Sequence, residues 1–523
     1  MACSCWKDTL LQLYFRLCSV FFWFINLFLT KKFVSCPKDP LLLKSATELK
    51  KLIRNREVTS TEVIESYIKR IEDVNPILNA VALKNFEEAR EQAKEADKQI
   101  AEMGDEWLDK LFDNKPLFGL PFTIKDSFKI KGKPCTVGVL SRQRKNEKMT
   151  ENAVAVQRMF DAGAILLAVT TVPEAAMWVE TNTLAYGRSN NPYDSRRITG
   201  GSSGGEGALH GAGASLMGIG SDISGSIRIP SFCNGVFGLL PSPLMVPLNG
   251  HIPLFEETCY SYQMCRGGPL TRFAEDLPLL TRVLSNGDID QEEKIPIKNL
   301  RIFYVEGLTH CQQIEPLRPI PKEAMMKAVH HFEHKFGVTA QCIALPETVD
   351  LLAMQGAATF DEQSPKLSQL MEDITTPGPE VNCNKELLKA LVGQSEYTIP
   401  LITLAMNPIV NNLTHEQYEE LAEKREMFKK RIQDLLGDDG VLFYPSWPTQ
   451  VPYHWETVIK STTAIHAGMV NTLLLSAVQC PMGLTDGLPD GVQIIANQGS
   501  EKILIDIAQE ISSAFGGWVP PGQ

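Results

Sequence analysis

The sequence predicts an α/β protein with one large domain behind an apolar N-terminal segment. Short apolar runs, separated by Gly and Pro, begin after residue 117 and alternate with stretches of helical periodicity. Such alternation is typical of buried strands in a sheet covered by helices. No Gly- or Ser-rich linker interrupts residues 45–523, so we expect one domain over residues 41–523, preceded by an anchor and link at residues 1–40.

Five runs are expected to be strands, because each is short, apolar and bounded by turn-forming residues. They are Leu120–Ile124, Ala164–Val169, Leu216–Ile219, Val441–Tyr444 and Gly491–Ala496. Capping-box spacing predicts helices that start at Ser45 and at Thr59, since a Glu follows each of them three residues later. The charged, Ala-rich stretch Asn85–Met103 is expected to be helical as well.

The composition is that of an ordinary globular protein and excludes several classes of function. With 51 basic and 62 acidic residues the net charge is −11, which argues against a nucleic-acid partner. The 12 cysteines are scattered without a Cys-x-x-Cys pair. We therefore expect neither a disulfide scaffold nor a structural zinc site.

The segment from Leu10 to Leu29 is dominated by Leu, Phe, Val, Ile and Trp. It has about the 20 residues that a helix needs to cross a bilayer, and Arg16 lies near one end, where its side chain could snorkel to the interface. Thr30-Lys31-Lys32 follows in place of a small-residue cleavage site, which disfavours a signal peptide. We expect a single-pass transmembrane helix that attaches the protein to an intracellular membrane.

The sequence leaves the membrane topology open. Lys31, Lys32 and Lys38 follow the apolar segment and only Lys7 precedes it, which favours a cytosolic domain. A glycosylation sequon at Asn412 is compatible with a luminal domain.

Two Gly- and Ser-rich clusters, Gly200–Gly205 and Gly220–Pro230, are the strongest chemical signal in the chain. A phosphate-binding P-loop requires a Lys-Ser/Thr pair after the glycines. No such pair follows the first cluster, and no Gly-x-Gly-x-x-Gly occurs, so nucleotide binding is not expected.

The first cluster also satisfies Gly-x-Ser-x-Gly, the nucleophile elbow of α/β-hydrolases. In that alternative the protein is an esterase with Ser202 as its nucleophile and His454 or His466 as its base. An elbow requires a strand directly before it, whereas Asn190–Ser195 is rich in turn-forming residues. The elbow also leaves the second cluster unexplained.

Both clusters resemble motifs of the amidase-signature family. That family has a serine in Gly-Gly-Ser-Ser-Gly, here Ser202, and its nucleophile in Asp-x-x-Gly-Ser-Ile-Arg-x-Pro, here Ser226, 24 residues later. Its lysine lies upstream in a Gly-ψ-Pro-ψ-ψ-ψ-Lys-Asp segment (ψ mostly apolar), which corresponds to Gly119–Asp126 and places the lysine at Lys125. The similarity covers nearly everything after the N-terminal segment, including Tyr186–Tyr193 and Gly483–Ala496.

The resemblance implies an α/β/α fold around a mixed twisted sheet and a serine hydrolase that needs neither metal nor cofactor. Ser226 would be the nucleophile, Ser202 a proton bridge after a cis Gly201–Ser202 peptide, and Lys125 the base. A lysine near its ordinary pKa of about 10.4 is charged and cannot accept a proton. Burial at the end of an apolar strand would lower the pKa of Lys125 and leave neutral amine available at about pH 7 to 8.

The same resemblance gives supporting roles to residues around the nucleophile. The oxyanion hole would consist of backbone N–H groups at and beside Ser226, those of Ile223, Ser224, Gly225 and Ser226. We expect Asp222 and Arg228 to pair and brace this loop. Ser203 is expected to form a supporting hydrogen bond.

Three residues depart from the family pattern. Ser224 replaces a glycine, His210 stands where a small aliphatic residue or Thr is usual, and Leu240 replaces a lysine. A β-carbon at position 224 could strain or narrow the oxyanion loop. The alternative to an active enzyme is therefore a catalytically weakened binder of lipid amides, although the three expected catalytic residues are retained.

Two further segments allow a second interpretation. His330–His334 matches His-x-x-Glu-His, a zinc-peptidase motif, but a solvated helix face explains it as well, and we expect no metal site. Leu387–Leu404 is unusually apolar, which is ordinary for a core helix. A resemblance to fatty-acid amide hydrolases makes the same segment a candidate entrance for a lipid substrate.

Within the family the sequence is most similar to fatty-acid amide hydrolases, including the apolar N-terminal segment. This resemblance implies hydrolysis of primary fatty-acid amides and N-acylethanolamines to a free fatty acid and an amine or ammonia, through an acyl-Ser226 intermediate. An amidotransferase A subunit would share the three residues, but the N-terminal segment argues against it. The sequence leaves head-group preference, chain length and a homodimer open.

Overall fold

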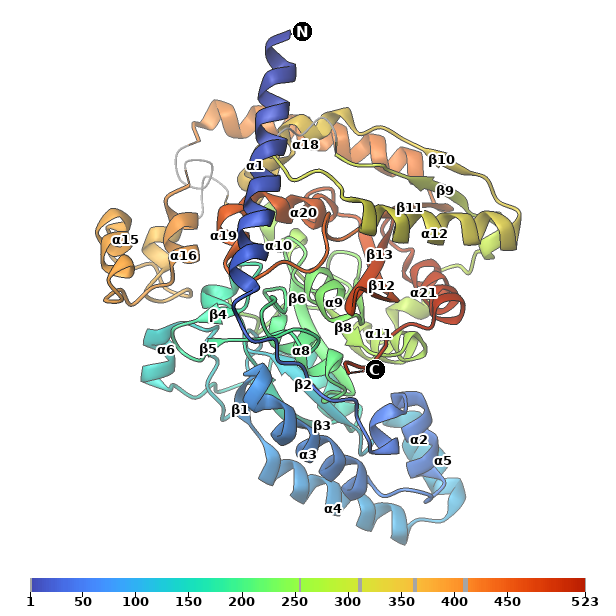
Figure 1. The fold of residues 1–523 in the computed structure, drawn as a ribbon. Helices are drawn as coiled ribbons and strands as arrows, with labels where there is room; N and C mark the ends of the chain where they lie inside the picture. The colour runs from blue at the N-terminus through green and yellow to red at the C-terminus, as the bar shows by residue number, and fades with distance from the viewer. Residues whose placement is uncertain (1, 254, 309–312, 361–364, 408–412, 523) are drawn as a thin grey trace.

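The computed structural model describes residues 2–253, 255–308, 313–360, 365–407 and 413–522, with side chains from residue 10 onward. The sequon at Asn412 lies outside these residues. Within them an 11-stranded sheet runs through the molecule in the order β1-β3-β2-β6-β8-β7-β12-β13-β11-β9-β10 (Figure 1). Its strands are β1 (Val81–Lys84), β2 (Pro121–Lys125), β3 (Ile165–Thr170), β6 (Met217–Asp222), β7 (Phe237–Leu240), β8 (Arg266–Thr271), β9 (Arg301–Tyr304), β10 (Ala340–Cys342), β11 (Gly440–Tyr444), β12 (Ser476–Thr485) and β13 (Leu488–Ala496).

The strand directions confirm the predicted α/β fold with a mixed sheet. Strands β3, β2 and β6 are parallel, and so are β11, β9 and β10. Between these two groups, β8, β7, β12 and β13 pair antiparallel with their neighbours. A separate ladder joins β4 (Asn182–Thr183) to β5 (Gly187–Arg188).

Each of the five predicted strands is present, as β2, β3, β6, β11 and β13, and the predicted helices form as well. The side chains of Ser45 and Thr59 each accept a hydrogen bond from the backbone N–H of the Glu three residues later. The side chain of that Glu accepts a hydrogen bond from the backbone N–H of the capping residue, which completes a capping box. The α-helices are α1 (Ala2–Asn26), α2 (Ala46–Arg54), α3 (Ser60–Leu78), α4 (Phe86–Glu102), α5 (Asp105–Asn114), α6 (Leu140–Lys145), α7 (Val154–Asp161), α8 (Gly204–Gly211), α9 (Arg228–Asn234), α10 (Tyr260–Met264), α11 (Leu277–Ser285), α12 (Pro319–Phe336), α13 (Leu351–Thr359), α14 (Leu367–Leu370), α15 (Cys383–Leu391), α16 (Ile399–Ala405), α18 (His415–Leu436), α19 (Glu456–Ile459), α20 (Ile465–Thr472) and α21 (Glu501–Phe515).

Alternate side chains of β11 show that the sheet separates two apolar layers. Val441 and Phe443 belong to a core formed with α12 and α21, whereas Leu442 and Tyr444 belong to a core formed with α18 and α20. Successive side chains of a strand point to opposite faces. Helices therefore cover both faces of the sheet at this strand, as an α/β/α arrangement requires.

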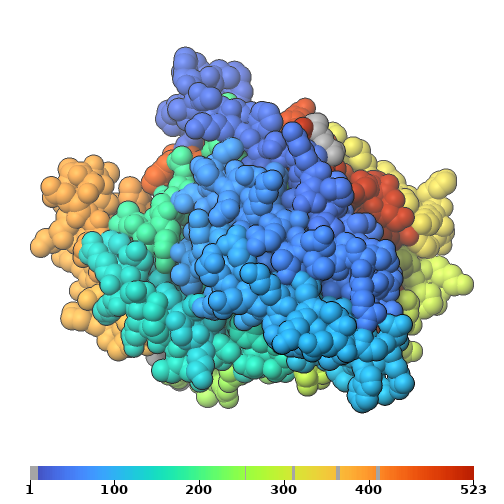
Figure 2. Space-filling model, turned by 90° about the horizontal axis from the view of Figure 1, so that it is seen from below, coloured from blue at the N-terminus to red at the C-terminus, as the bar shows by residue number. Residues whose placement is uncertain are grey.

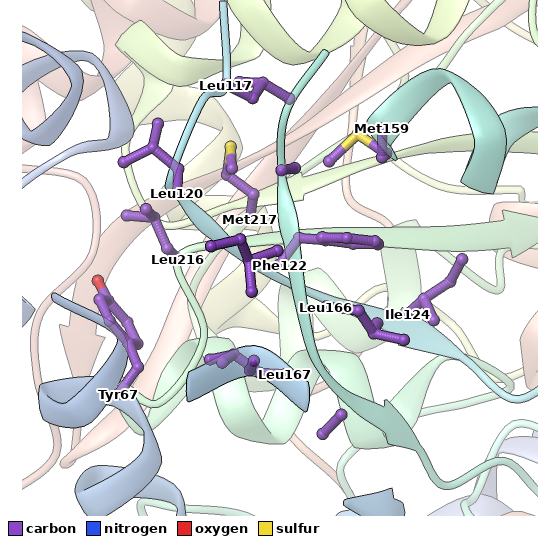
Figure 3. Packing of buried hydrophobic residues seen from close by; sticks show 14 of the residues in the cluster. Tyr67, Leu117, Leu120, Phe122, Ile124, Met159, Leu166, Leu167, Leu216 and Met217 are labelled. Carbon is purple, nitrogen blue, oxygen red and sulfur yellow. The ribbon is translucent and has the colours of Figure 1, made fainter. Parts of the chain in front are cut away.

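Strand β2 uses the same alternation to position the predicted lysine. Phe122 and Ile124 are buried in a hydrophobic cluster with side chains of β3 and α7 (Figure 3). Thr123 and Lys125 point to the other face of the strand, where the Lys125 amine donates to Ser202 at 2.7 Å. The apolar packing of one face thus fixes the place of the amine on the other.

The segment predicted to cross a membrane forms α1, but among the described residues we find no helix with the length and apolar character that a membrane span requires. Gln12, Arg16 and Asn26 interrupt its apolar run. The inner face of α1 instead packs on the protein, where Phe15 and Phe22 are buried. The prediction of a transmembrane helix is therefore not supported.

Polar contacts also join α1 to the rest of the protein. Tyr14 donates from its hydroxyl to the carbonyl of Ile459 at 2.8 Å, and Lys460 donates to the Ser19 hydroxyl at 2.7 Å. The C-terminal part of α1 lies against α19, while its N-terminal part projects from the molecule (Figure 1).

The apolar stretch Leu387–Leu404 forms the end of α15 and most of α16, not a single core helix. Leu388 and Leu391 of α15 are exposed, whereas Leu401 and Ile402 of α16 are buried. In Figure 2 the orange segment that contains these helices projects at one side of the face formed by the blue N-terminal helices.

Phe122→Ala is expected to lower the free energy of unfolding by about 3–5 kcal/mol, because it leaves a cavity beneath β2. The measurement is the midpoint of denaturant-induced unfolding of the full chain. Trp107→Ala is the matched control, since Trp107 is 65% exposed on α5 and its loss should shift the midpoint little. Equal shifts in the two variants would contradict the assignment of Phe122 to the core.

Candidate active site

Lys125 ends β2 with its side chain buried. Its Nζ donates to the Ser202 Oγ at 2.7 Å, to the Ser221 Oγ at 2.9 Å and to the Ser221 carbonyl oxygen at 3.0 Å. Burial lowers the pKa of Lys125 to about 7, because removal from water disfavours the charged form. A pKa lowered by burial is what the sequence analysis expected at Lys125, and the role of this amine as a base stays a prediction.

Ser202 lies in the Gly-rich segment that leads into α8, and the peptide bond between Gly201 and Ser202 is cis, as the resemblance implied. This segment packs closely on the chain before β4. A β-carbon on Gly201 would lie 2.6 Å from the Trp178 carbonyl oxygen, so only glycine fits there. The close packing holds Ser202 against Lys125.

Ser226 follows β6 and lies beside the other two predicted catalytic residues. Lys125, Ser202 and Ser226 line one small cavity of about 20 Å³. Ser203 links the two Ser-containing segments, since its N–H donates to the Ser226 carbonyl at 3.2 Å. In the described structure no hydrogen bond joins the hydroxyls of Ser202 and Ser226, and the second half of the predicted relay stays a prediction.

The loop expected to form the oxyanion hole lies next to Ser226, with Ile223 and Ser224 on the wall of a larger cavity. The N–H of Gly225 was expected in the oxyanion hole, but it donates to the Asp222 carboxylate at 2.6 Å. Gly225 instead provides a backbone φ of +107°, and a β-carbon there would lie 2.5 Å from Ala467. The N–H groups left for an oxyanion are those of Ile223, Ser224 and Ser226.

Asp222 and Arg228 form the predicted brace. Both side chains are fully buried and the Arg228 Nε lies 3.1 Å from the Asp222 carboxylate. Burial alone would raise the pKa of Asp222, but the guanidinium and the N–H groups of Gly225 and Ile227 lower it to about 2. The Asn471 amide also donates to this carboxylate, at 3.0 Å.

Comparisons with known proteins identify the family of this chain. A family model described as Amidase matches residues 62–505. The chain belongs to the amidase signature family. It is 37% identical over 498 residues to fatty-acid amide hydrolase 2 of Homo sapiens, an alignment that covers 93% of this chain and 91% of the relative. It is 36% identical over 492 residues to fatty-acid amide hydrolase 2-A of Danio rerio, with the same two coverages.

The fold of this amidase-signature hydrolase also matches solved structures. A structure of 6-aminohexanoate cyclic dimer hydrolase has a TM-score of 0.73 and covers 92% of this chain and 99% of its own, at 23% identity. At that identity the likeness concerns the fold alone.

Ser224, the first departure from the family pattern, fits its position without backbone strain. It is absent from the described residues with positive φ, so the β-carbon is tolerated. Its hydroxyl accepts a hydrogen bond from the Gln355 amide of α13. The additional side chain thus ties the oxyanion loop to a wall of the larger cavity.

Neither of the other two departures lines the small cavity that contains Lys125, Ser202 and Ser226. His210 is buried in α8, and burial lowers the pKa of its imidazole to about 3, so the ring is neutral. Leu240 is buried in β7 and packs in the core formed with α18 and α20. Neither replaces a group that Ser202 or Ser226 requires.

The esterase alternative disagrees with the structure. His454 bonds to the Glu180 carboxylate at 2.8 Å and to the Ser195 carbonyl at 3.2 Å. His466 bonds to the Tyr444 hydroxyl and, at 2.9 Å, to the Glu315 carbonyl. Both ring nitrogens of each histidine are therefore occupied elsewhere, and neither side chain can serve Ser202. A loop, not a strand, precedes the Ser202 segment.

The zinc-peptidase alternative also finds no support in the described residues, which contain no group of three or more potential His, Cys, Asp or Glu ligands. His330 and His334 are exposed on α12, and Phe332 between them packs in the core. His331 bonds to the Glu510 carboxylate at 2.6 Å. The motif therefore lies on an amphipathic helix, with its first and last histidines exposed and its phenylalanine in the core.

The sequence analysis gave no role to four residues of the site: Ser221, His251, Gln355 and Asn471. Ser221 lies inside the second cluster, next to Asp222, and its position there was a usable signal. The other three come from distant parts of the chain. Only folding brings them to the site.

Asp222→Asn is expected to destabilise the protein by about 3–5 kcal/mol, because it leaves the Arg228 charge buried without its partner. Denaturant-induced unfolding measures the loss. Asp434→Asn breaks the exposed pair of Asp434 with Lys430 and serves as the control, with a loss of at most about 1 kcal/mol. Similar losses in both variants would show that the Asp222–Arg228 pair does not brace the loop.

Proposed function

We propose that this amidase-signature hydrolase cleaves fatty-acid amides through an acyl-enzyme on Ser226. The observation that carries the proposal is the buried Lys125 amine, which bonds to Ser202 in the cavity that also contains Ser226. Serine is a weak nucleophile until a base removes its proton. A lysine with a pKa of about 7 is such a base near neutral pH.

The proposed reaction passes one proton along the three side chains. Lys125 accepts the Ser202 proton while Ser202 accepts that of Ser226, and the Ser226 Oγ bonds to the amide carbon. The carbonyl electron pair moves to oxygen, where the N–H groups of Ile223, Ser224 and Ser226 stabilise it. The carbon–nitrogen bond then breaks, and the relay returns the proton to the leaving amine. Water cleaves the acyl ester by the same steps.

The larger cavity supports a fatty acyl chain as the part of the substrate next to Ser226. It has a volume of about 260 Å³ and reaches from Ser226 to α13, α16 and α19. Its walls are mostly apolar, and include Met177, Val179, Leu352, Phe360, Leu404, Val458 and Ile465. Apolar walls with few polar groups are typical of sites for lipid-like ligands. The 37% identity to a fatty-acid amide hydrolase 2 supports the same substrate class.

The outward face of α1 supports a second part of the proposal, attachment to a membrane surface. Leu17, Val20, Phe21, Trp23 and Phe24 are each more than half exposed. Large contiguous apolar patches mark sites of interaction with membranes or proteins. Helix α1 contacts α19, and α19 contributes Val458 to the wall of the larger cavity, so a lipid-binding α1 would suit an enzyme whose substrate resides in lipid.

The catalytic proposal is tested by the pH dependence of hydrolysis of a primary fatty-acid amide and an N-acylethanolamine. We expect kcat/KM to rise as the pH passes about 7, because Lys125 has to lose its proton before it can act. Ser226→Ala should abolish turnover, and Lys125→Met should lower it by at least about 100-fold and remove the rise.

Ser513→Ala, on the exposed side of α21, is the control and should behave as the wild type. Turnover that survives Ser226→Ala would overturn the mechanism and make Ser202 the nucleophile. Absence of wild-type turnover with both lipids would favour the alternative of a lipid-amide binder.

Membrane attachment is tested by flotation with vesicles of phosphatidylcholine and phosphatidylserine. A variant with Leu17→Glu, Phe21→Glu and Phe24→Glu is expected to leave the vesicle fraction, because charged side chains oppose burial in lipid. The matched control places three Glu at Trp107, Val349 and Met427, which are also exposed but lie elsewhere. Equal loss of binding in both variants would count against a role for α1.

A further inference from the structure

A second hydrogen-bonded branch leaves Lys125 on the side away from Ser202. The Lys125 amine bonds to both oxygens of Ser221, its hydroxyl at 2.9 Å and its carbonyl at 3.0 Å. The Ser221 hydroxyl in turn lies 2.8 Å from the Nε2 of His251. Ser221 and His251 also line the small cavity that contains Ser226.

The environment of His251 determines which ring nitrogen carries hydrogen. Its Nδ1 lies 3.0 Å from the Pro253 carbonyl oxygen, and a carbonyl can only accept, so Nδ1 is the donor. Burial, together with the nearby Lys125, lowers the pKa of His251 to about 3, and the ring is neutral. A neutral imidazole with hydrogen on Nδ1 leaves Nε2 as an acceptor. The Ser221 hydroxyl therefore donates to Nε2.

This direction of donation restricts the amine of Lys125. Because the Ser221 hydrogen is engaged by His251, the Ser221 oxygen has to accept an N–H from Lys125. The Ser221 carbonyl accepts another. The charged amine donates to all three partners, Ser202 included. The neutral amine that acts as a base has two N–H groups and one lone pair, so the lone pair takes the place of the N–H that points to the Ser202 hydroxyl, 2.7 Å away.

Other groups near Ser221 and His251 do not change this assignment of donors and acceptors. The Ser127 hydroxyl lies 3.5 Å from the Ser221 Oγ, which is at the limit of a hydrogen bond and weaker than the contact with His251. Besides Lys125, the titratable groups that act on the cluster are Cys265, Asp222 and Glu206, and they act on the lysine. The Phe128 ring packs edge-on against the imidazole, with 5.0 Å between the centroids.

We propose that His251 is a positioning residue that, through Ser221, directs the lone pair of Lys125 onto Ser202. The proposal rests on the proposed role of Lys125 as base. Without an acceptor at this place, the Ser221 hydroxyl is free to donate to the amine instead. It then occupies the lone pair and leaves Lys125 with no basic site for Ser202.

The test follows the rate at which a fluorophosphonate labels Ser226, as a function of pH, because labelling needs an activated serine but no particular amide substrate. His251→Phe keeps an apolar ring beside Phe128 and removes the acceptor. It is expected to lower the labelling rate by about 10- to 100-fold, the loss that a misdirected catalytic group produces. The midpoint of the pH profile should shift as well. His251→Gln, which offers an amide oxygen to Ser221, should recover most of the rate.

A double-mutant cycle separates positioning from a structural effect. Ser221→Ala removes the hydroxyl through which His251 acts, so adding His251→Phe to it should cause no further loss. Additive losses, or a His251→Gln variant as slow as His251→Phe with an unchanged unfolding midpoint, would overturn the proposal. So would an unaltered rate and pH profile in His251→Phe.

The same assay distinguishes a failure of this inference from a failure of the proposed function. If wild type is not labelled at Ser226, the proposed nucleophile is wrong, and the inference about His251 falls with it. If wild type is labelled rapidly and only in the presence of intact Lys125, the base is established. The comparison among the His251 and Ser221 variants then decides the inference alone.

Discussion

The burial of one amine, that of Lys125, is the constraint on which the arrangement of this site depends. Its hydrogen-bond partners are two serine hydroxyls and a carbonyl, all neutral, so the protein does not fully replace the hydration that an ammonium group loses. The pKa of Lys125 falls to about 7 as a result. The apolar cluster under β2 maintains that burial, which makes the stability of the sheet a condition of the chemistry.

Neighbouring titratable groups show how environment alone separates chemical roles. Asp222 is as deeply buried as Lys125, yet its pKa falls to about 2, because Arg228 and backbone N–H groups stabilise the carboxylate. Glu206, with no such partner, has its pKa raised by burial to about 8 and accepts bonds from threonine hydroxyls. The charge states of these two carboxyl groups and one amine are thus set by burial and by hydrogen-bond partners, not by residue type.

The loop that carries Ser226 is held from two sides, and this explains how it accommodates an unusual residue. On one side the buried Asp222–Arg228 pair fixes the turn through the N–H groups of Gly225 and Ile227. On the other, Ser224 is bonded to Gln355 of α13. The side chain that departs from the family pattern is therefore a link between the loop and the wall of the larger cavity. The Ser224 side chain can affect a substrate through the part of the substrate that lies against this wall.

The sequence by itself determined five strands of the sheet, the two capped helices, and the motifs that contain Lys125, Ser202 and Ser226, because local periodicity and motif spacing record these features directly. Its prediction of a transmembrane helix is not supported in the described residues. Composition indicates that the N-terminal segment is apolar but not whether it packs on the protein, as Phe15 and Phe22 of α1 do. The sequence also missed His251, Gln355 and Asn471, and it assigned the Gly225 N–H to the wrong partner. Only the tertiary structure decides such contacts, because the hydrogen-bond partner of a buried group depends on which distant strand or helix closes over it.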